Sequence, residues 1–246
     1  MRFLLLVTLF TAAAFGQSPV QPAKESLHLY LLVGQSNMAG RGVVEAQDQK
    51  PHPRVLMLSR DGAWVPAVDP MHFDKPSAGV GLGKTFGAII AEAHPGGPTG
   101  LPPCAVGGSP FDPGTPGVFS PATKSHTWDD MAKRLEVALK SGTVKGILWH
   151  QGESDSLPEL APAYEAKLHD LIQRLRAAVK NPDVPFIAGQ MGKFADKPWT
   201  EECRIVDQAH QTPPLSALRA CNTKATRSTL IPLPFGSWAS ATRSSF

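Results

Sequence analysis

Short apolar runs alternate with longer segments of helical spacing along most of this chain. The runs are bounded by Gly, Pro and polar residues and predict five buried strands, at residues 27–33, 54–58, 102–106, 144–150 and 184–189. Apolar residues three and four apart predict four helices, at residues 79–93, 126–140, 158–180 and 201–210. Strands that alternate with helices indicate a parallel sheet covered on both faces, so the predicted fold class is α/β.

Polar, glycine-bearing turns follow three of the predicted strands directly. They are Gly34–Ser36, Gly107–Gly108 and Gln151–Glu153. Ligands of parallel sheets bind beyond the carboxyl ends of the strands, and we therefore expect these turns to form one site. The segment Ser109–Ser125, which contains several Pro and Gly residues, is predicted to be a surface loop at the rim of this site.

The composition is that of a soluble protein with one domain. The chain has 246 residues, of which 42% are hydrophobic and 18% charged, and its net charge is only +3. This charge balance argues against a dedicated nucleic-acid binder, which would show a basic stripe.

The first 16 residues have the pattern of a secretory signal. Arg2 precedes a nearly continuous apolar run, Phe3–Phe15, and small residues follow at the expected cleavage point. A buried N-terminal strand is the alternative interpretation. No later run has the length of a membrane span. The sequence thus predicts a secreted or periplasmic protein that does not bind membranes after cleavage near Gln17.

The chain contains three cysteines, Cys104, Cys203 and Cys221. An oxidising compartment would permit one disulfide among them, and Cys104–Cys203 is the pair to test. None has the spacing of a zinc or redox site.

Ser36 has the placement of a catalytic nucleophile. A serine hydroxyl needs a base to remove its proton and N–H groups to hold the developing oxyanion. The N–H groups of Ser36, Gly107 and Gly108 could serve as donors, and the side-chain amide of Gln151 could be another. The alternative is that Ser36 is a polar turn residue that caps the next helix.

Three segments of the chain resemble sequence blocks of a known family. Leu32–Gly42 (Leu-Val-Gly-Gln-Ser-Asn-Met-Ala-Gly-Arg-Gly), Pro103–Ser109 (Pro-Cys-Ala-Val-Gly-Gly-Ser) and Trp149–Asp155 (Trp-His-Gln-Gly-Glu-Ser-Asp) resemble blocks of the SGNH hydrolases, in their sialate O-acetylesterase-like branch of carbohydrate acetylesterases. The resemblance extends from about Leu27 to about His210. It implies a three-layer α/β/α sandwich with a flavodoxin-like parallel sheet, an acetylated carbohydrate as substrate, and no metal or organic cofactor.

The resemblance also implies roles for individual residues. Ser36 would be the nucleophile, and Ser36, Gly107 or Gly108, and Gln151 would form the oxyanion hole. Asn37 and Glu153 would support the pocket.

The C-terminal part of the chain departs from the family pattern. The family ends with Asp and His three residues apart, the His as base and the Asp as its orienter, whereas Gln208–Phe246 contains no Asp or Glu. Asp207 and His210 match this spacing only within a predicted helix, and we interpret the match as a coincidence, with His210 on the helix surface. A catalytic pair of Asp207 and His210 is the alternative.

Residues 211–246 are therefore predicted to be an aberrant, poorly ordered tail that lacks the last elements of the fold. A frameshift would explain it, because the shifted reading frame permits an Asp-x-x-His block and requires a Gly at the Trp238–Ala239 codons, where the family has one. The alternative function is a catalytically impaired member of the family or a non-catalytic glycan-binding protein.

Several other residues admit a functional interpretation. His150 and Glu153 could form a two-ligand metal pair, but without a third ligand we predict no metal site. His72 and His126 are predicted to be exposed loop residues, and His169 to be solvated. Trp128 and Trp149 could stack on a sugar, although core packing is favoured for Trp149.

Overall fold

The computed structural model describes residues 26–193 and 199–210. The predicted signal at 1–16, the tail at 211–246 and Cys221 lie outside these residues. Within them the chain forms a six-stranded sheet of order β3-β2-β4-β1-β5-β6. The strands are β1 (Leu27–Gly34), β2 (Val55–Leu58), β3 (Trp64–Pro66), β4 (Thr99–Leu101), β5 (Gly142–His150) and β6 (Phe186–Ala188). All neighbouring pairs are parallel except β2 and β3, which are antiparallel.

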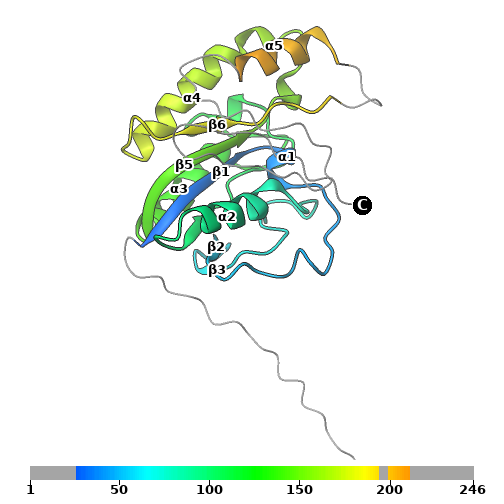
Figure 1. The fold of residues 1–246 in the computed structure, drawn as a ribbon. Helices are drawn as coiled ribbons and strands as arrows, with labels where there is room; N and C mark the ends of the chain where they lie inside the picture. Colours follow the sequence, from blue (N-terminus) through cyan, green and yellow to red (C-terminus); the bar gives the residue numbers. More distant parts are fainter. Residues whose placement is uncertain (1–25, 194–198, 211–246) are drawn as a thin grey trace, which may run out of the picture.

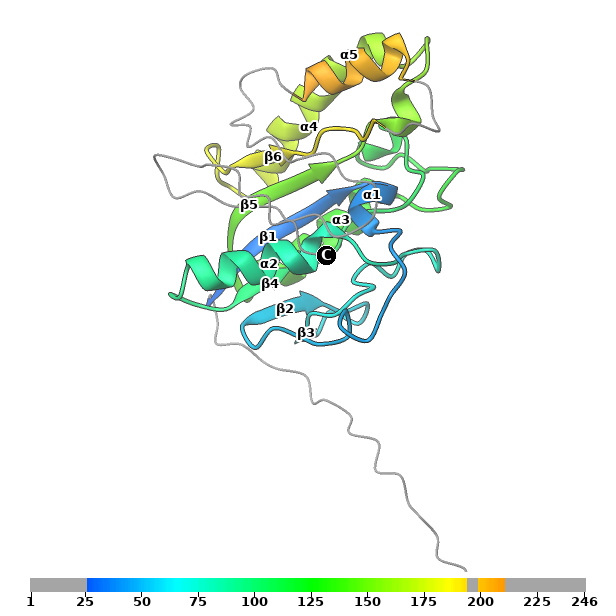
Figure 2. The ribbon, with the colours of Figure 1, turned by 45° about the vertical axis from the view of Figure 1, so that its right-hand side comes forward.

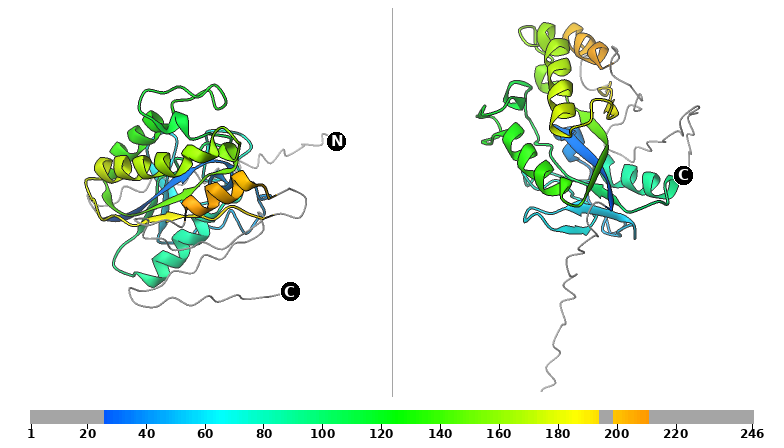
Figure 3. Two further views of the ribbon diagram at one scale, coloured as in Figure 1. Left: turned by 90° about the horizontal axis from the view of Figure 1, so that it is seen from above. Right: turned by 90° about the vertical axis from the view of Figure 1, so that its left-hand side faces the viewer.

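Helices cover both faces of this sheet, as Figures 1 and 2 show. The described α-helices are α1 (Ser36–Ala39), α2 (Leu82–Ala93), α3 (Thr127–Leu139), α4 (Tyr164–Ala178) and α5 (Glu201–Ala209). Seen along the sheet in the right-hand view of Figure 3, α2 lies on one side and α3 and α4 on the other, while α5 packs beside α4. Short 3-10 turns, η1 (Asp112–Gly114), η2 (Glu153–Asp155) and η3 (Ala161–Ala163), complete the elements. The predicted α/β/α layering is confirmed.

Two apolar layers hold the sheet between the helices. One joins strand residues such as Trp149 and Leu31 to apolar side chains of α3, α4 and α5. The other joins Leu32 and Leu148 to α1 and α2. Neighbouring strand residues such as Leu148 and Trp149 belong to opposite layers because successive side chains of a strand point to opposite faces.

The strand predicted at 102–106 begins earlier than the apolar pattern indicates. β4 covers Thr99–Leu101, and the chain then continues beside β1, where Cys104 N donates to Leu32 O at 2.8 Å. The prediction missed β4 because Gly96, Gly97, Pro98 and Gly100 surround Thr99 and interrupt the apolar pattern, although Thr99 and Gly100 are both buried. The antiparallel strand β3 and the late start of α4, at Tyr164 rather than at residue 158, were not predicted either.

Cys104 and Cys203, the pair to test for a disulfide, do not form one, because both thiols are free. Cys104 is buried in the layer that faces α3, where burial raises the pKa of its thiol to about 12. Cys203 lies on α5, and its backbone N–H donates to Thr200 Oγ1, which caps that helix.

Gly34 permits the sharp turn at the end of β1. Its φ of 142° is unfavourable for residues with a side chain, and an added Cβ would collide with the carbonyl oxygen of His150. We predict that Gly34→Ala lowers the free energy of unfolding by at least about 2 kcal/mol. Gly96→Ala is the control, because nothing lies within 4 Å of its added Cβ, and it should change stability by less than about 0.5 kcal/mol. Urea denaturation measures both, and equal effects would contradict the role of Gly34.

Candidate active site

Ser36 begins α1 directly beyond the end of β1. The residues on both sides of it are held by one carboxylate, because Gln35 Nε2 donates to Glu153 Oε2 at 2.7 Å and Asn37 Nδ2 donates to Glu153 Oε1. Gln35 N also donates to His150 O at 2.9 Å. These bonds tie the first predicted turn to the third, and they place Glu153 and Asn37 beside the half-buried Ser36.

The second turn is tied to the first by the bond from Val106 N to Gly34 O, at 3.2 Å. Within the described residues, no hydrogen bond involves the N–H groups of Gly107 or Gly108, whereas Ser109 N donates to Val106 O. The Ser36 N–H has no such bond either, as is usual at the start of a helix. Three backbone N–H groups near the end of β1 thus have no hydrogen-bond partner among the described residues, and their role as oxyanion donors stays a prediction.

Cationic side chains flank the glycine pair. A Cβ on Gly107 would collide with Arg41 Nη2, so the guanidinium occupies the place that a side chain would take. Arg41 Nη1 in turn donates to Gly40 O at 2.7 Å and to Ser77 O at 3.2 Å. A Cβ on Gly108 would lie 3.8 Å from Lys75 Nζ. Positive charge beside an oxyanion site favours the developing negative charge.

Gln151, the predicted side-chain donor, is engaged elsewhere in this structure. Its Nε2 donates to Asp155 Oδ2 and, at 3.4 Å, to Ser109 O, while its Oε1 accepts from Tyr164 Oη at 2.9 Å. Asp155 also accepts two bonds from Phe111 N, at 3.0 and 3.2 Å. Gln151 therefore fastens the second turn to the third, and its role as an oxyanion donor stays a prediction that requires the amide to change partners.

His210 does not lie on the helix surface, and this prediction is wrong. The residue is 2% exposed, and its Nε2 lies 2.9 Å from Tyr164 Oη. Burial, together with the nearby His150, lowers the pKa of His210 to about 3. Asp207 accepts a bond from Met191 N at 3.2 Å, and His210 Nδ1 has no partner among the described residues. No hydrogen bond from His210 Nδ1 therefore joins it to Asp207, the other member of the alternative catalytic pair.

Two other histidine predictions are corrected by burial. His72 is 4% exposed rather than exposed, because the loop that carries it packs beneath the rim near Asp74, Arg134 and Arg41. His169 is half-buried, and its Nε2 is shielded from solvent and has no partner among the described residues. His126 is exposed, as predicted, and lies beside Phe119.

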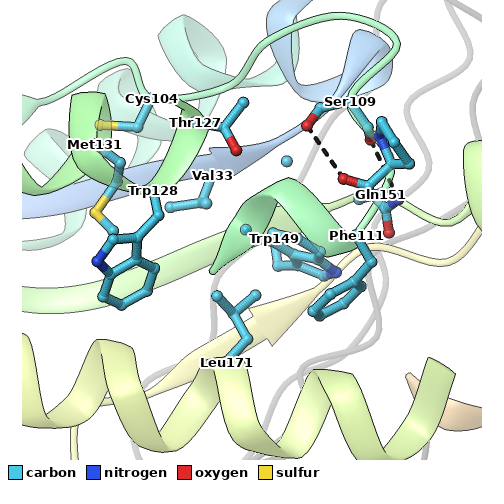
Figure 4. Close-up of a pocket in the computed structure, with 13 residues that line it drawn as sticks. Val33, Cys104, Ser109, Phe111, Thr127, Trp128, Met131, Trp149, Gln151 and Leu171 are labelled. Atoms are coloured by element: carbon cyan, nitrogen blue, oxygen red, sulfur yellow. Dashed lines mark hydrogen bonds between the residues drawn. The ribbon is translucent and has the colours of Figure 1, made fainter. Parts of the chain in front are cut away.

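A small cavity lies below the strand ends, between β1, β5 and the start of α3 (Figure 4). Its volume is about 40 Å³. Ser109 and Gln151 line one end of it and Trp128 and Met131 the other. Trp149 is buried in the core, as favoured, and Trp128 is partly buried beneath Arg174, whose Cζ lies 4.6 Å from the ring centre.

In residues 26–193 and 199–210, no group of three or more His, Cys, Asp or Glu side chains is arranged to hold a metal ion. No helix in these ranges combines the length and the apolar character of a membrane span.

The sequence interpretation missed two residues of the site. Arg41 stands inside the first motif, so its position in Leu32–Gly42 was a usable signal. Tyr164 appeared only as an apolar position of the helix at 158–180. Its hydroxyl instead bonds to Gln151 and His210 and accepts from Trp149 Nε1 at 3.3 Å, which helical spacing could not reveal.

Comparisons with known proteins agree on one family. The family model described as "Carbohydrate esterase, sialic acid-specific acetylesterase" matches residues 26–230. A protein of Arabidopsis thaliana described as a "Probable carbohydrate esterase" is 33% identical over 192 residues, which are 70% of each chain. The X-ray structure of the same Arabidopsis protein covers 78% of this chain and 85% of its own, with a TM-score of 0.67 and 29% identity.

Two further solved structures share the fold at lower identity. NanS is 18% identical, with a TM-score of 0.64 over 82% of this chain and 80% of its own. A carbohydrate acetylesterase of Xanthomonas citri is also 18% identical, with a TM-score of 0.58 over 82% of this chain and 52% of its own.

We predict that His72 makes the stability of the protein depend on pH. Burial lowers the pKa of His72 from 6.5 to about 4, and Arg134 and Arg41 lower it further while Asp74 opposes them. Between these values the unfolded chain binds a proton that the folded chain does not bind. Stability should therefore fall as pH falls from about 6.5 to about 4, by about 3 kcal/mol from this residue.

The measurement is urea denaturation across this pH range. In His72→Gln the slope should be smaller, and in the exposed-site control His126→Gln it should match the parent. A His72→Gln slope equal to that of the parent would show that His72 is not held neutral by the fold.

Proposed function

This chain belongs to the sialic acid-specific acetylesterase family of carbohydrate esterases, and on that footing we propose that it removes O-acetyl groups from a carbohydrate through an acyl-enzyme on Ser36. The observation that carries the proposal is the convergence of three strand ends on one serine. Glu153 holds both neighbours of Ser36, and Val106 binds the end of β1. The N–H groups of Ser36, Gly107 and Gly108, which have no hydrogen-bond partner among the described residues, lie near the end of β1.

The proposed reaction proceeds in two steps. Ser36 Oγ attacks the acetyl carbonyl carbon while a base takes its proton, and the carbonyl oxygen becomes an oxyanion held by the backbone N–H groups. The bond to the sugar oxygen then breaks, and the sugar leaves with a proton. Water attacks the acetyl-serine in the same way and releases acetate. Arg41 and Lys75, beside the glycine pair, add positive charge to the oxyanion site.

A second candidate is a catalytically impaired, glycan-binding member of the family. The observation that favours it is the absence of Asp and Glu from Gln208–Phe246, together with the engagement of His210 by Tyr164. Without a base, triad-type sites retain only about 10³–10⁴-fold acceleration over water. Sugar binding without ester turnover would distinguish this candidate from an active esterase.

We predict that Ser36→Ala lowers kcat/KM for a chromogenic acetyl ester by at least about 10³-fold, because the alanine cannot form the acyl-enzyme. Ser141→Ala, at the opposite edge of the sheet between α3 and β5, should retain full activity. Turnover that survives Ser36→Ala would overturn the proposed nucleophile.

We predict that Glu153→Gln lowers kcat/KM by about 10²-fold. The amide nitrogen of Gln would face the donor groups of Gln35 and Asn37, so the two hydrogen bonds that hold the neighbours of Ser36 would weaken. The control is Glu159→Gln, because Glu159 is an exposed Glu of the same segment. Equal kinetics for the two variants on the same ester would show that these two hydrogen bonds do not position Ser36.

A further inference from the structure

Every histidine of the chain lies in the part that the structure describes. The eight are His28, His52, His72, His94, His126, His150, His169 and His210, and residues 211–246 contain no further histidine. An imidazole base for Ser36 that this sequence itself supplies is therefore one of these eight. Their positions decide which of them can serve.

Position removes most of the candidates. His28 lies at the amino end of β1, His94 follows α2, and His52 precedes β2. All three are therefore at the amino ends of the strands, whereas Ser36 follows the carboxyl end of β1. His126 precedes α3 and contacts Phe119, and His169 lies within α4; both helices cover the face of the sheet opposite α1.

The two most deeply buried histidines lie beside other parts of the structure. His72 lies against the backbone of Leu32, within β1, and His210 lies against Tyr164 in the apolar layer on the face of the sheet opposite α1. One histidine remains at the carboxyl end of the sheet beside β1.

That histidine is His150, the last residue of β5. Its Cα pairs with that of Gly34, and its carbonyl oxygen accepts the bond from Gln35 N at 2.9 Å. Leu148, two residues earlier, belongs to the layer that includes Met38 and Ala39 of α1. Because alternate residues of a strand share a face, the ring of His150 lies on the same face of the sheet as α1, which begins with Ser36.

The ring also carries a nitrogen that is not engaged by β6. Gly189, which follows β6, approaches the ring most closely at Cδ2, since an added Cβ would lie 2.6 Å from Cδ2 and 3.2 Å from Cγ and Nε2. Nδ1 is on the opposite edge of the ring, away from Gly189. Nδ1 is buried and has no hydrogen-bond partner among the described residues.

Two charged or titratable groups act on this ring. Burial lowers the pKa of His150, so the imidazole is neutral at pH 7 and can accept a proton, while the Glu153 carboxylate raises its pKa and would stabilise the imidazolium once formed. His210 is the second group, and the two rings disfavour each other's protonation.

We propose that His150 is the general base for Ser36 in this chain, an inference that rests on the proposed function. Nδ1 takes the proton of Ser36 Oγ as Oγ bonds to the acetyl carbon, which requires the neutral tautomer with its hydrogen on Nε2. The imidazolium then gives the proton to the sugar oxygen as the carbon–oxygen bond to the sugar breaks. In the second step Nδ1 takes a proton from water, and that proton returns to Ser36 Oγ when acetate leaves. Glu153 thereby both positions the nucleophile and balances the charge of the base.

The experiment compares His150→Gln and His150→Gly with His126→Gln in the full chain, on a chromogenic acetyl ester. Loss of a general base should lower kcat/KM by about 10²–10⁴-fold in both His150 variants, and His126→Gln should match the parent. Added imidazole should restore part of the activity of His150→Gly but leave the parent unchanged. Circular dichroism checks that the variants fold.

The pH profile of the parent gives a second measurement that needs no variant. A His150 base predicts that kcat/KM falls at acid pH with an apparent pKa below 6.5, within the range where the parent remains folded. Parent activity that requires Ser36 but survives in His150→Gln would overturn His150 as the base and leave the proposed function intact. A parent that shows no turnover would overturn both, and sugar binding would then identify the glycan-binding alternative.

Discussion

The candidate site depends on the backbone bonds that fix the end of β1 between its two neighbours. On one side Gln35 N donates to His150 O at 2.9 Å, and on the other Val106 N donates to Gly34 O at 3.2 Å. These bonds require a glycine at 34, because any side chain there would collide with the His150 carbonyl. Three turns that are distant in sequence are thereby brought around Ser36, and the apolar layers on both faces of the sheet hold the strands in register.

Side-chain hydrogen bonds add to these backbone bonds around Ser36. Glu153 holds the residues on both sides of Ser36, and Gln151 and Asp155 hold the segment that carries Ser109 and Phe111. Gln35, Gln151 and Asp155 are deeply buried, so their hydrogen bonds matter more than they would at the surface, whereas Glu153 itself is exposed. Burial also keeps the nearby imidazoles neutral by lowering their pKa, which is the state a proton acceptor needs.

The sequence predicted the architecture well because its signals are local. Apolar runs located β1, β5 and β6, and helical spacing located α2, α3 and α5, since both patterns depend on burial of one face. The strand β4 was misplaced because its Thr and Gly are buried by neighbouring strands rather than by their own hydrophobicity. The motif residues Ser36, Asn37 and Glu153 were identified from sequence, and the structure brings them together.

What the sequence could not predict is contact between distant side chains. The burial of His72 and His210, the hydroxyl bonds of Tyr164 and the placement of Arg41 against Gly107 all depend on tertiary packing. The failed Cys104–Cys203 pair has the same origin, because cysteine spacing carries no information on distance.

The most direct test of the central claim is to trap the covalent intermediate. The full chain would be mixed with an acetyl ester, quenched in acid within the first turnovers and digested for mass spectrometry. An acyl-enzyme on Ser36 predicts one acetyl group on the peptide that contains Ser36, and none on that peptide in Ser36→Ala. Steady ester turnover with no acetyl group on Ser36 at any quench time would contradict it.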